Sequence, residues 1–213
     1  FLNPEFNNLI MTQLEPFEDG IMINSTTLWA VVDGMGNYKY RGFELLEKAG
    51  ITDLNPKKEQ WFRQVDLFQV FKWIEEELGQ EVLVRIGAKV PKNALFPELK
   101  EKRDLSILAD IDVAYHMNHK NKNGQILYDP NRPEGERFLK GIGHYTYEPV
   151  DLPDLAQVVC KNPYPCDFDI GILYSFTRMV FPKCVVEHAP NTKCRRTSDS
   201  KSCTYLIKTN DLM

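Results

Sequence analysis

The stretch that decides the fold is NPYPCDFDIGILYSFTRMVFPKCVVEH, residues 162–188. Within it, Ile170, Leu173, Phe176 and Val180 recur at helical spacing, which predicts a helix over 167–181. Short segments rich in β-branched or aromatic residues lie on both sides of this helix and are typical of strands. These segments are 125–128, 137–147, 156–160, 184–187 and 204–208. One helix set among several short strands indicates an antiparallel sheet with a C-terminal helix packed on it.

The N-terminal half has a different, mostly helical pattern. Residues 40–50 carry apolar side chains on one helical face, and Gly50 stands where a left-handed C-cap residue is expected. Residues 61–78 form the clearest amphipathic pattern, closed by Gly79. Residues 81–90 are apolar but ambiguous, whereas 103–119 favours another helix. Helices followed by an antiparallel sheet predict an α+β fold.

Composition and charge narrow the class of protein. The chain has 213 residues, so we expect a single ligand-binding domain over 11–213, mostly helical at 11–100 and sheet-containing at 101–213. Residues 1–10 precede Met11 and read as a vector-derived tail. A formal charge of -4 provides no global attraction for nucleic acid, and no apolar run is long enough for a membrane span. Five cysteines, an odd and modest number, favour a reducing cytoplasm.

Four of the five cysteines are concentrated in the last quarter of the chain. They are Cys166, Cys184, Cys194 and Cys203. Metal binding, nucleophilic catalysis and simple burial all compete as explanations, because free cysteine is among the most buried residue types. Cys166 begins the predicted helix, where the helix dipole favours a thiolate. The turn-rich segment between Cys194 and Cys203 can bring both sulfurs to one atom, although the spacing is not that of a zinc finger.

The order of these features resembles the 4-vinyl reductase domain found in the sensor modules of phenol- and xylene-responsive transcription activators. A cysteine opens an aromatic-rich helix, a strand ends in Glu187, two cysteines flank a short turn, and a final strand follows. The resemblance covers about a fifth of the chain, from residue 165 to 207. It implies a structural zinc held by Cys166, Glu187, Cys194 and Cys203. The segment HAPNTK lengthens the usual spacing after Glu187, so His188 is an alternative ligand.

Candidate ligand-binding residues lie outside the cysteine cluster. Aromatic side chains such as Trp73 and Phe176 suit a pocket for a flat apolar molecule, although core packing is the favoured use for most aromatic residues of the chain. His144 lies in a predicted strand, and its face decides between ligand binding and solvent exposure. His116 stands three residues before His119 near a predicted helix end. A metal or ligand site is conceivable there, but the helix dipole and carbonyl capping are the favoured explanation for such histidines.

These patterns together predict a cytoplasmic sensor domain that binds a small apolar or aromatic molecule and is braced by zinc. Its output would pass through a homodimer or a separate partner. The sequence has no GxGxxG turn after a strand, Walker A loop, GxSxG elbow or HExxH motif, so an enzyme is the less favoured interpretation. Two alternatives remain. One is a heme or gas-sensing domain with a histidine ligand to iron, and the other is a ligand-free interaction module.

Overall fold

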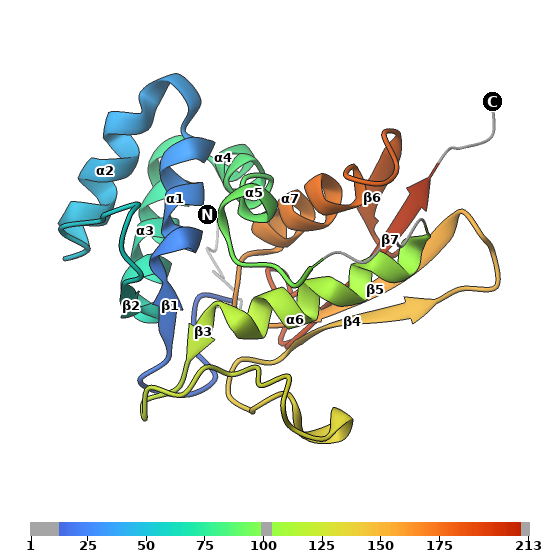
Figure 1. Cartoon of the computed structure of the whole chain (residues 1–213). Helices are drawn as coiled ribbons and strands as arrows, with labels where there is room; N and C mark the ends of the chain where they lie inside the picture. The colour runs from blue at the N-terminus through green and yellow to red at the C-terminus, as the bar shows by residue number, and fades with distance from the viewer. Residues whose placement is uncertain (1–12, 99–103, 210–213) are drawn as a thin grey trace, which may run out of the picture.

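The computed structural model describes residues 13–98 and 104–209. Its C-terminal half contains a four-stranded antiparallel sheet in the order β4-β5-β7-β6 (Figure 1). The strands are β4 (His144–Pro149), β5 (Leu155–Lys161), β6 (Cys184–His188) and β7 (Cys203–Thr209). Alternate residues of β5 and β7 are buried, as period-two side chains require when one face of a sheet is covered. Cys160 pairs with both Tyr145 and Cys203, so these three side chains share the covered face.

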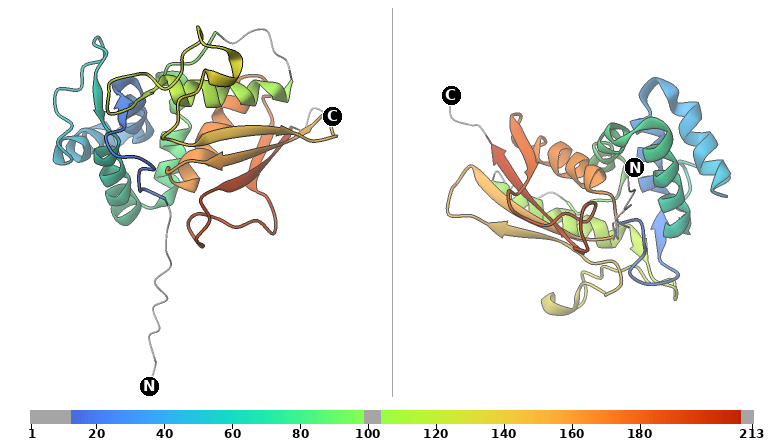
Figure 2. Two further views of the ribbon diagram at one scale, coloured as in Figure 1. Left: turned by 90° about the horizontal axis from the view of Figure 1, so that it is seen from below. Right: turned by 180° about the vertical axis from the view of Figure 1, so that it is seen from behind.

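Two helices lie across that face. They are α6 (Asp110–Met117), preceded by the 3-10 turn η2 (Leu105–Ala109), and α7 (Cys166–Thr177) (Figures 1 and 2). Helix α7 packs against β6 and β7, and α6 packs against β4. The space between the two helices and the sheet is therefore the centre of this half of the molecule.

The N-terminal half adds a layer of helices beside α7. Three short strands, β1 (Met22–Asn24), β2 (Trp61–Arg63) and β3 (His119–Lys120), form a second antiparallel sheet in the order β2-β1-β3. The helices of this half are α1 (Ser25–Gly34), α2 (Lys39–Lys48), α3 (Gln64–Leu78), α4 (Gln80–Gly87) and α5 (Val90–Asn93). A 3-10 turn, η1 (Gly36–Tyr38), joins α1 to α2, and another, η3 (Glu134–Glu136), precedes β4. Among the helices described, none has the length and hydrophobicity that crossing a bilayer needs.

The α+β class predicted from the sequence is confirmed, with helices first and a sheet packed against α7 afterwards. Gly50 and Gly79 have left-handed φ values of 82° and 87°, as expected after α2 and α3. The strand expected over 137–147 begins only at His144. Gly141 and Gly143, with φ of 124° and 79°, break the extended backbone before it. Residues 125–128 form isolated bridges instead of a strand. The predicted tail, 1–10, lies outside the described residues.

Helices α4 and α7 approach so closely that glycine is required on both. A Cβ atom built on Gly171 would lie 2.1 Å from the carbonyl oxygen of Val84, and one on Gly87 would lie 2.1 Å from that of Phe168. These are backbone atoms, which cannot move aside as the end of a flexible side chain can. This contact fixes α7, which carries residues of both candidate sites described below, against the N-terminal helices.

We predict that Gly171→Ala lowers the free energy of unfolding by about 1–3 kcal/mol or more, because the added methyl forces α4 and α7 apart. Urea denaturation followed by circular dichroism measures the change. Gly135→Ala is the matched control, since its Cβ meets nothing within 4 Å. A Gly171→Ala protein as stable as this control would contradict the close-packing argument.

Candidate functional site

The first candidate site is a cluster of three cysteines and one histidine. Cys166 begins α7, His188 ends β6, Cys194 lies in the following loop and Cys203 begins β7. Their ligand atoms all lie within 4.8 Å of one another. The Cys166 sulfur is 3.4 Å from that of Cys194 and 3.2 Å from that of Cys203. The Cys194 sulfur is 3.8 Å from His188 Nε2. Residues distant in sequence therefore converge on one point.

Of the two ligand choices at the end of β6, the structure places His188, not Glu187, in the cluster. Successive side chains of a strand point to opposite faces, so only one of these neighbours faces inward. Glu187 is exposed and pairs with Lys208 on β7. The His188 ring packs on Tyr205 at 4.6 Å between centroids and reaches Cys194. Cys184, at the other end of β6, lies outside the cluster.

Two thiols of the cluster form a hydrogen bond with each other. The Sγ atoms of Cys166 and Cys203 are hydrogen-bonded, which lowers the pKa of Cys203 and raises the pKa of Cys166. The sequence suggested the opposite for Cys166, because a helix dipole favours a thiolate at that position. Its hydrogen bond to Cys203, together with burial, outweighs the dipole here.

Arg195, next to Cys194, is completely buried. Its backbone N–H lies 3.4 Å and its Nε 3.5 Å from the Cys203 sulfur. The guanidinium also donates to the Asn162 side-chain oxygen at 2.6 Å and forms an ion pair with the buried carboxylate of Asp169 on α7. Burial raises the pKa of Asp169 to about 6 although Arg195 lowers it, so the pair is ionised at neutral pH.

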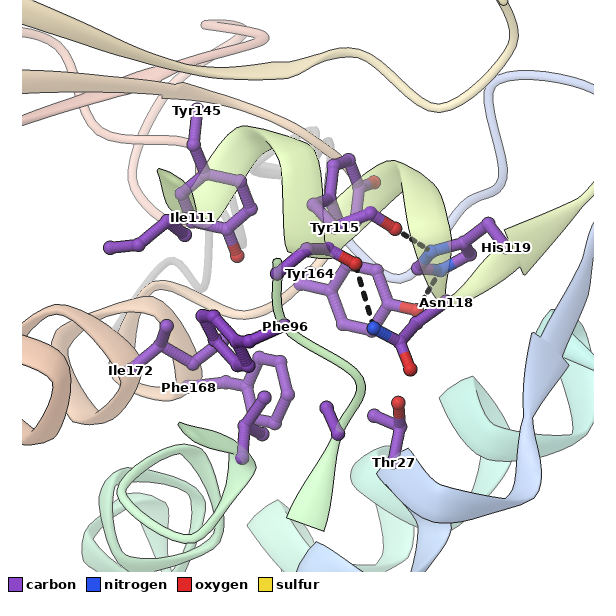
Figure 3. Close-up of a pocket in the computed structure, with 13 residues that line it drawn as sticks. Thr27, Phe96, Ile111, Tyr115, Asn118, His119, Tyr145, Tyr164, Phe168 and Ile172 are labelled. Atoms are coloured by element: carbon purple, nitrogen blue, oxygen red, sulfur yellow. Dashed lines mark hydrogen bonds between the residues drawn. The ribbon is translucent and has the colours of Figure 1, made fainter. Parts of the chain in front are cut away.

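The second candidate site is a cavity of about 40 Å³ where α1, α5, α6, α7 and β4 meet (Figure 3). Its lining is almost entirely apolar. The residues are Thr27, Val90, Ala94, Phe96, Ile111, Ala114, Tyr115, Asn118, His119, Tyr145, Tyr164, Phe168 and Ile172. Four of them, Ile111, Ala114, Tyr115 and Asn118, follow the three- and four-residue spacing of one face of α6, continued past its C-terminus.

A chain of hydrogen bonds forms one wall of the cavity. His119 Nδ1 donates to the Tyr115 carbonyl at 2.6 Å, which leaves Nε2 to accept from the Tyr164 hydroxyl at 2.7 Å (Figure 3). Gln64 in turn donates to that hydroxyl at 3.2 Å. Thr27 differs from these residues, because its buried hydroxyl has no hydrogen-bond partner among the described residues. The cavity therefore offers one unsatisfied polar atom in an apolar setting.

The ligand-binding residues predicted from the sequence lie mainly away from this cavity. Phe176 is buried and stacks on Phe96 at 5.0 Å, so it supports the cavity wall from behind. Trp73 lies on α3 beneath Lys48 and is not part of the lining. His116 and His144 meet each other on another side of α6. The capping explanation for the two helical histidines holds, since His116 and His119 both bond the carbonyl four residues earlier.

Comparisons with known proteins identify the fold. No family model and no curated protein matches this sequence. An H-NOX protein mutant from S. oneidensis, solved in the Fe(II) ligation state, superposes with a TM-score of 0.55 at 14% identity over 89% of this chain and 97% of that one. A structure from work on heme distortion in the H-NOX family gives 0.52 at 15% identity, covering 89% and 94%. The chain therefore has an H-NOX-like α+β fold.

This finding corrects the family resemblance inferred from the sequence. Solved structures that superpose on this chain with TM-scores of 0.51–0.55 are H-NOX domains, not 4-vinyl reductase domains, so that assignment is wrong. The resemblance rested on an order of elements, helix, strand, turn and strand, that several α+β folds share. The likeness to these structures, at 14–16% identity, shows the fold alone.

The buried imidazole of His119 generates a pH prediction. Burial lowers its pKa to about 3, so below about pH 6.5 the unfolded chain binds a proton that the folded chain does not. Stability present above pH 6.5 is therefore lost as the pH falls, at roughly 1.4 kcal/mol per pH unit. We predict that the free energy of unfolding, measured by urea denaturation between pH 4.5 and 6, changes less with pH in His119→Gln than in the wild type. The difference in slope should be about this amount.

His144→Gln is the control for this measurement. The Asp112 side chain raises the pKa of His144, so its imidazole is protonated in both folded and unfolded chains across that pH window. Its replacement should leave the slope unchanged. Equal slopes in the wild type and His119→Gln would show that His119 is not held neutral in the folded protein.

Proposed function

We propose that this chain is a sensor domain that binds a small uncharged molecule, of the size of a dissolved gas, in the cavity beside α6 and α7. A zinc ion in the cluster of Cys166, His188, Cys194 and Cys203 would brace the same helix. The observation that carries the proposal is that α7 contributes to both sites, through Cys166 at its first turn and through Phe168 and Ile172 in the cavity wall. The H-NOX-like fold supports a sensory role.

The size and chemistry of the cavity favour a very small ligand. One water molecule needs about 10–15 Å³ by the same measure, so 40 Å³ accommodates only a few atoms. The lining excludes charge, while the unpartnered Thr27 hydroxyl can hydrogen-bond to one ligand atom. A flat aromatic molecule, as first expected from the sequence, is too large for this space.

The residues present do not fit heme, the group whose distortion was studied in the H-NOX family. The cavity is far smaller than a porphyrin, and no Lys or Arg lines it to pair with the two heme carboxylates. His119 is the one histidine in the lining, and both of its ring nitrogens are engaged. His116, His144 and His188 lie elsewhere. We therefore propose that the ligand binds directly to the protein.

The cysteine cluster fits zinc. Tetrahedral ligands at Zn–S distances of about 2.3 Å place sulfurs roughly 3.8 Å apart. The three sulfur separations are 3.4, 3.2 and 3.7 Å, and His188 supplies a nitrogen 3.8 Å from one sulfur. A small contraction or expansion of side chains therefore completes a Cys₃His site. When bound, zinc would tie α7, the end of β6 and the start of β7 together.

We predict that the purified protein holds about one equivalent of zinc by elemental analysis. Cys203→Ser should lose this metal and melt at a markedly lower temperature, because the three remaining ligands, which come from separate elements, then lack their common partner. Differential scanning calorimetry measures the second effect.

Cys184→Ser is the matched control, since its sulfur lies outside the cluster. It should keep both the zinc and the melting temperature of the wild type. Zinc retained in Cys203→Ser, or lost without any fall in melting temperature, would contradict the bracing role.

Xenon, a small apolar atom, can test whether the cavity is open to a ligand. Xenon pressure should shift the methyl NMR signals of Ala114, Ile111 and Ile172, which line the cavity. Ala114→Leu should abolish these shifts by filling the space, whereas Ala109→Leu, at an exposed position just before α6, should preserve them.

Hemin titration of the same proteins distinguishes direct binding from heme binding. We expect no sharp Soret band at one equivalent of hemin. A stoichiometric band that is lost in Ala114→Leu but kept in Ala109→Leu would overturn direct binding and establish a heme sensor.

A further inference from the structure

A second group of metal-ligating side chains lies on α6 outside the cavity lining. Asp112 and His116 are one turn apart on this helix, and His144 begins the neighbouring strand β4. One carboxylate oxygen and one nitrogen of each ring lie within 4.8 Å of one another. The two imidazole rings are 4.9 Å apart between centroids. The group shares no residue with the cysteine cluster or the cavity lining.

His116 is the member whose capping role accounts for only one of its two ring nitrogens. Its ring is completely buried, and Nδ1 lies 2.8 Å from the backbone carbonyl of Asp112. A carbonyl only accepts, so Nδ1 carries the proton and Nε2 presents a bare lone pair. That Nε2 has no hydrogen-bond partner among the described residues. A histidine held by a backbone carbonyl through one nitrogen, with the other free, is in the state that binds a metal.

The other two members are already oriented. Asp112 accepts from the backbone N–H of Tyr145 at 2.8 Å through one oxygen, and its second oxygen lies 3.0 Å from His144 Nδ1. An ion pair between Asp112 and His144 accounts for the contact between these two side chains. It leaves the buried Nε2 of His116 without a partner, and a buried polar atom of this kind requires one.

We propose that Asp112, His116 and His144 bind a divalent transition-metal ion of the borderline class, such as Zn²⁺ or Co²⁺. Two imidazoles and one carboxylate suit such ions, and three protein ligands leave a coordination position for water or another small ligand. Ligand atoms around one ion lie about 3.4 Å apart, and the ligand atoms of this group lie within 4.8 Å of one another. His144 is half-exposed and provides the path from solvent, while Lys161, opposite it on β5, moderates the affinity.

The absorption spectrum of bound Co²⁺ distinguishes this site from the cysteine cluster. Metal-free, reduced full-length protein should bind two equivalents of Co²⁺. One should give the intense near-ultraviolet charge-transfer bands of a thiolate site, and the other only weak visible bands from nitrogen and oxygen ligands. His144→Ala should lose the second equivalent, with at least a tenfold weaker affinity, and keep the thiolate bands. Because His144 is half-exposed, this variant should retain its circular dichroism spectrum.

Cys184→Ser serves as the control that should keep both equivalents, and Asp112→Asn tests the carboxylate independently of His144. A single equivalent with only thiolate bands in the wild type would overturn the proposal. So would a second equivalent that persists unchanged in His144→Ala, since the ion then lies elsewhere. Neither result depends on occupancy of the cavity, so this site stands or falls separately from the proposed sensor function.

Discussion

The buried ion pair between Arg195 and Asp169 is the interaction on which both candidate sites depend. Removing two charges from water costs several kcal/mol per ion, so such a pair persists only when hydrogen bonds satisfy both partners. Here they do: Asn162 and the Cys203 sulfur face the guanidinium, and Tyr145 donates to the carboxylate. The pair therefore fixes the loop after β6 against α7 in one arrangement.

This arrangement connects the cysteine cluster to the cavity through few covalent and hydrogen-bonded steps. Arg195 follows Cys194 in the chain and contacts Cys203, while Asp169 lies one turn after Cys166 on α7. The Tyr145 hydroxyl that binds Asp169 belongs to a side chain lining the cavity. A shift of the cysteine loop would therefore reach the cavity wall directly. A metal in the cysteine cluster and a ligand in the cavity would therefore both act on α7.

The sequence revealed local features that depend on nearby residues. Gly50 and Gly79 mark helix ends because a left-handed residue is needed there. The turn-rich segment between Cys194 and Cys203 indicated that both sulfurs can reach one point, where Cys166 also lies. The choice of His188 over Glu187 needed the strand register, which sequence alone does not set. The same limitation misled the family resemblance, since an order of elements does not specify how they pack.

The cavity lay beyond sequence analysis for a physical reason. Tyr164, His119 and Gln64 become neighbours only when α3, β3 and the loop before α7 meet, and none has a neighbour in sequence that signals this role. Apolar lining residues have the same pattern as core residues, because a cavity this small is a gap in the core. What separates a binding cavity from a packing defect is an unsatisfied polar atom, here the Thr27 hydroxyl. That property exists only in three dimensions, since it depends on what every neighbouring element leaves unbonded.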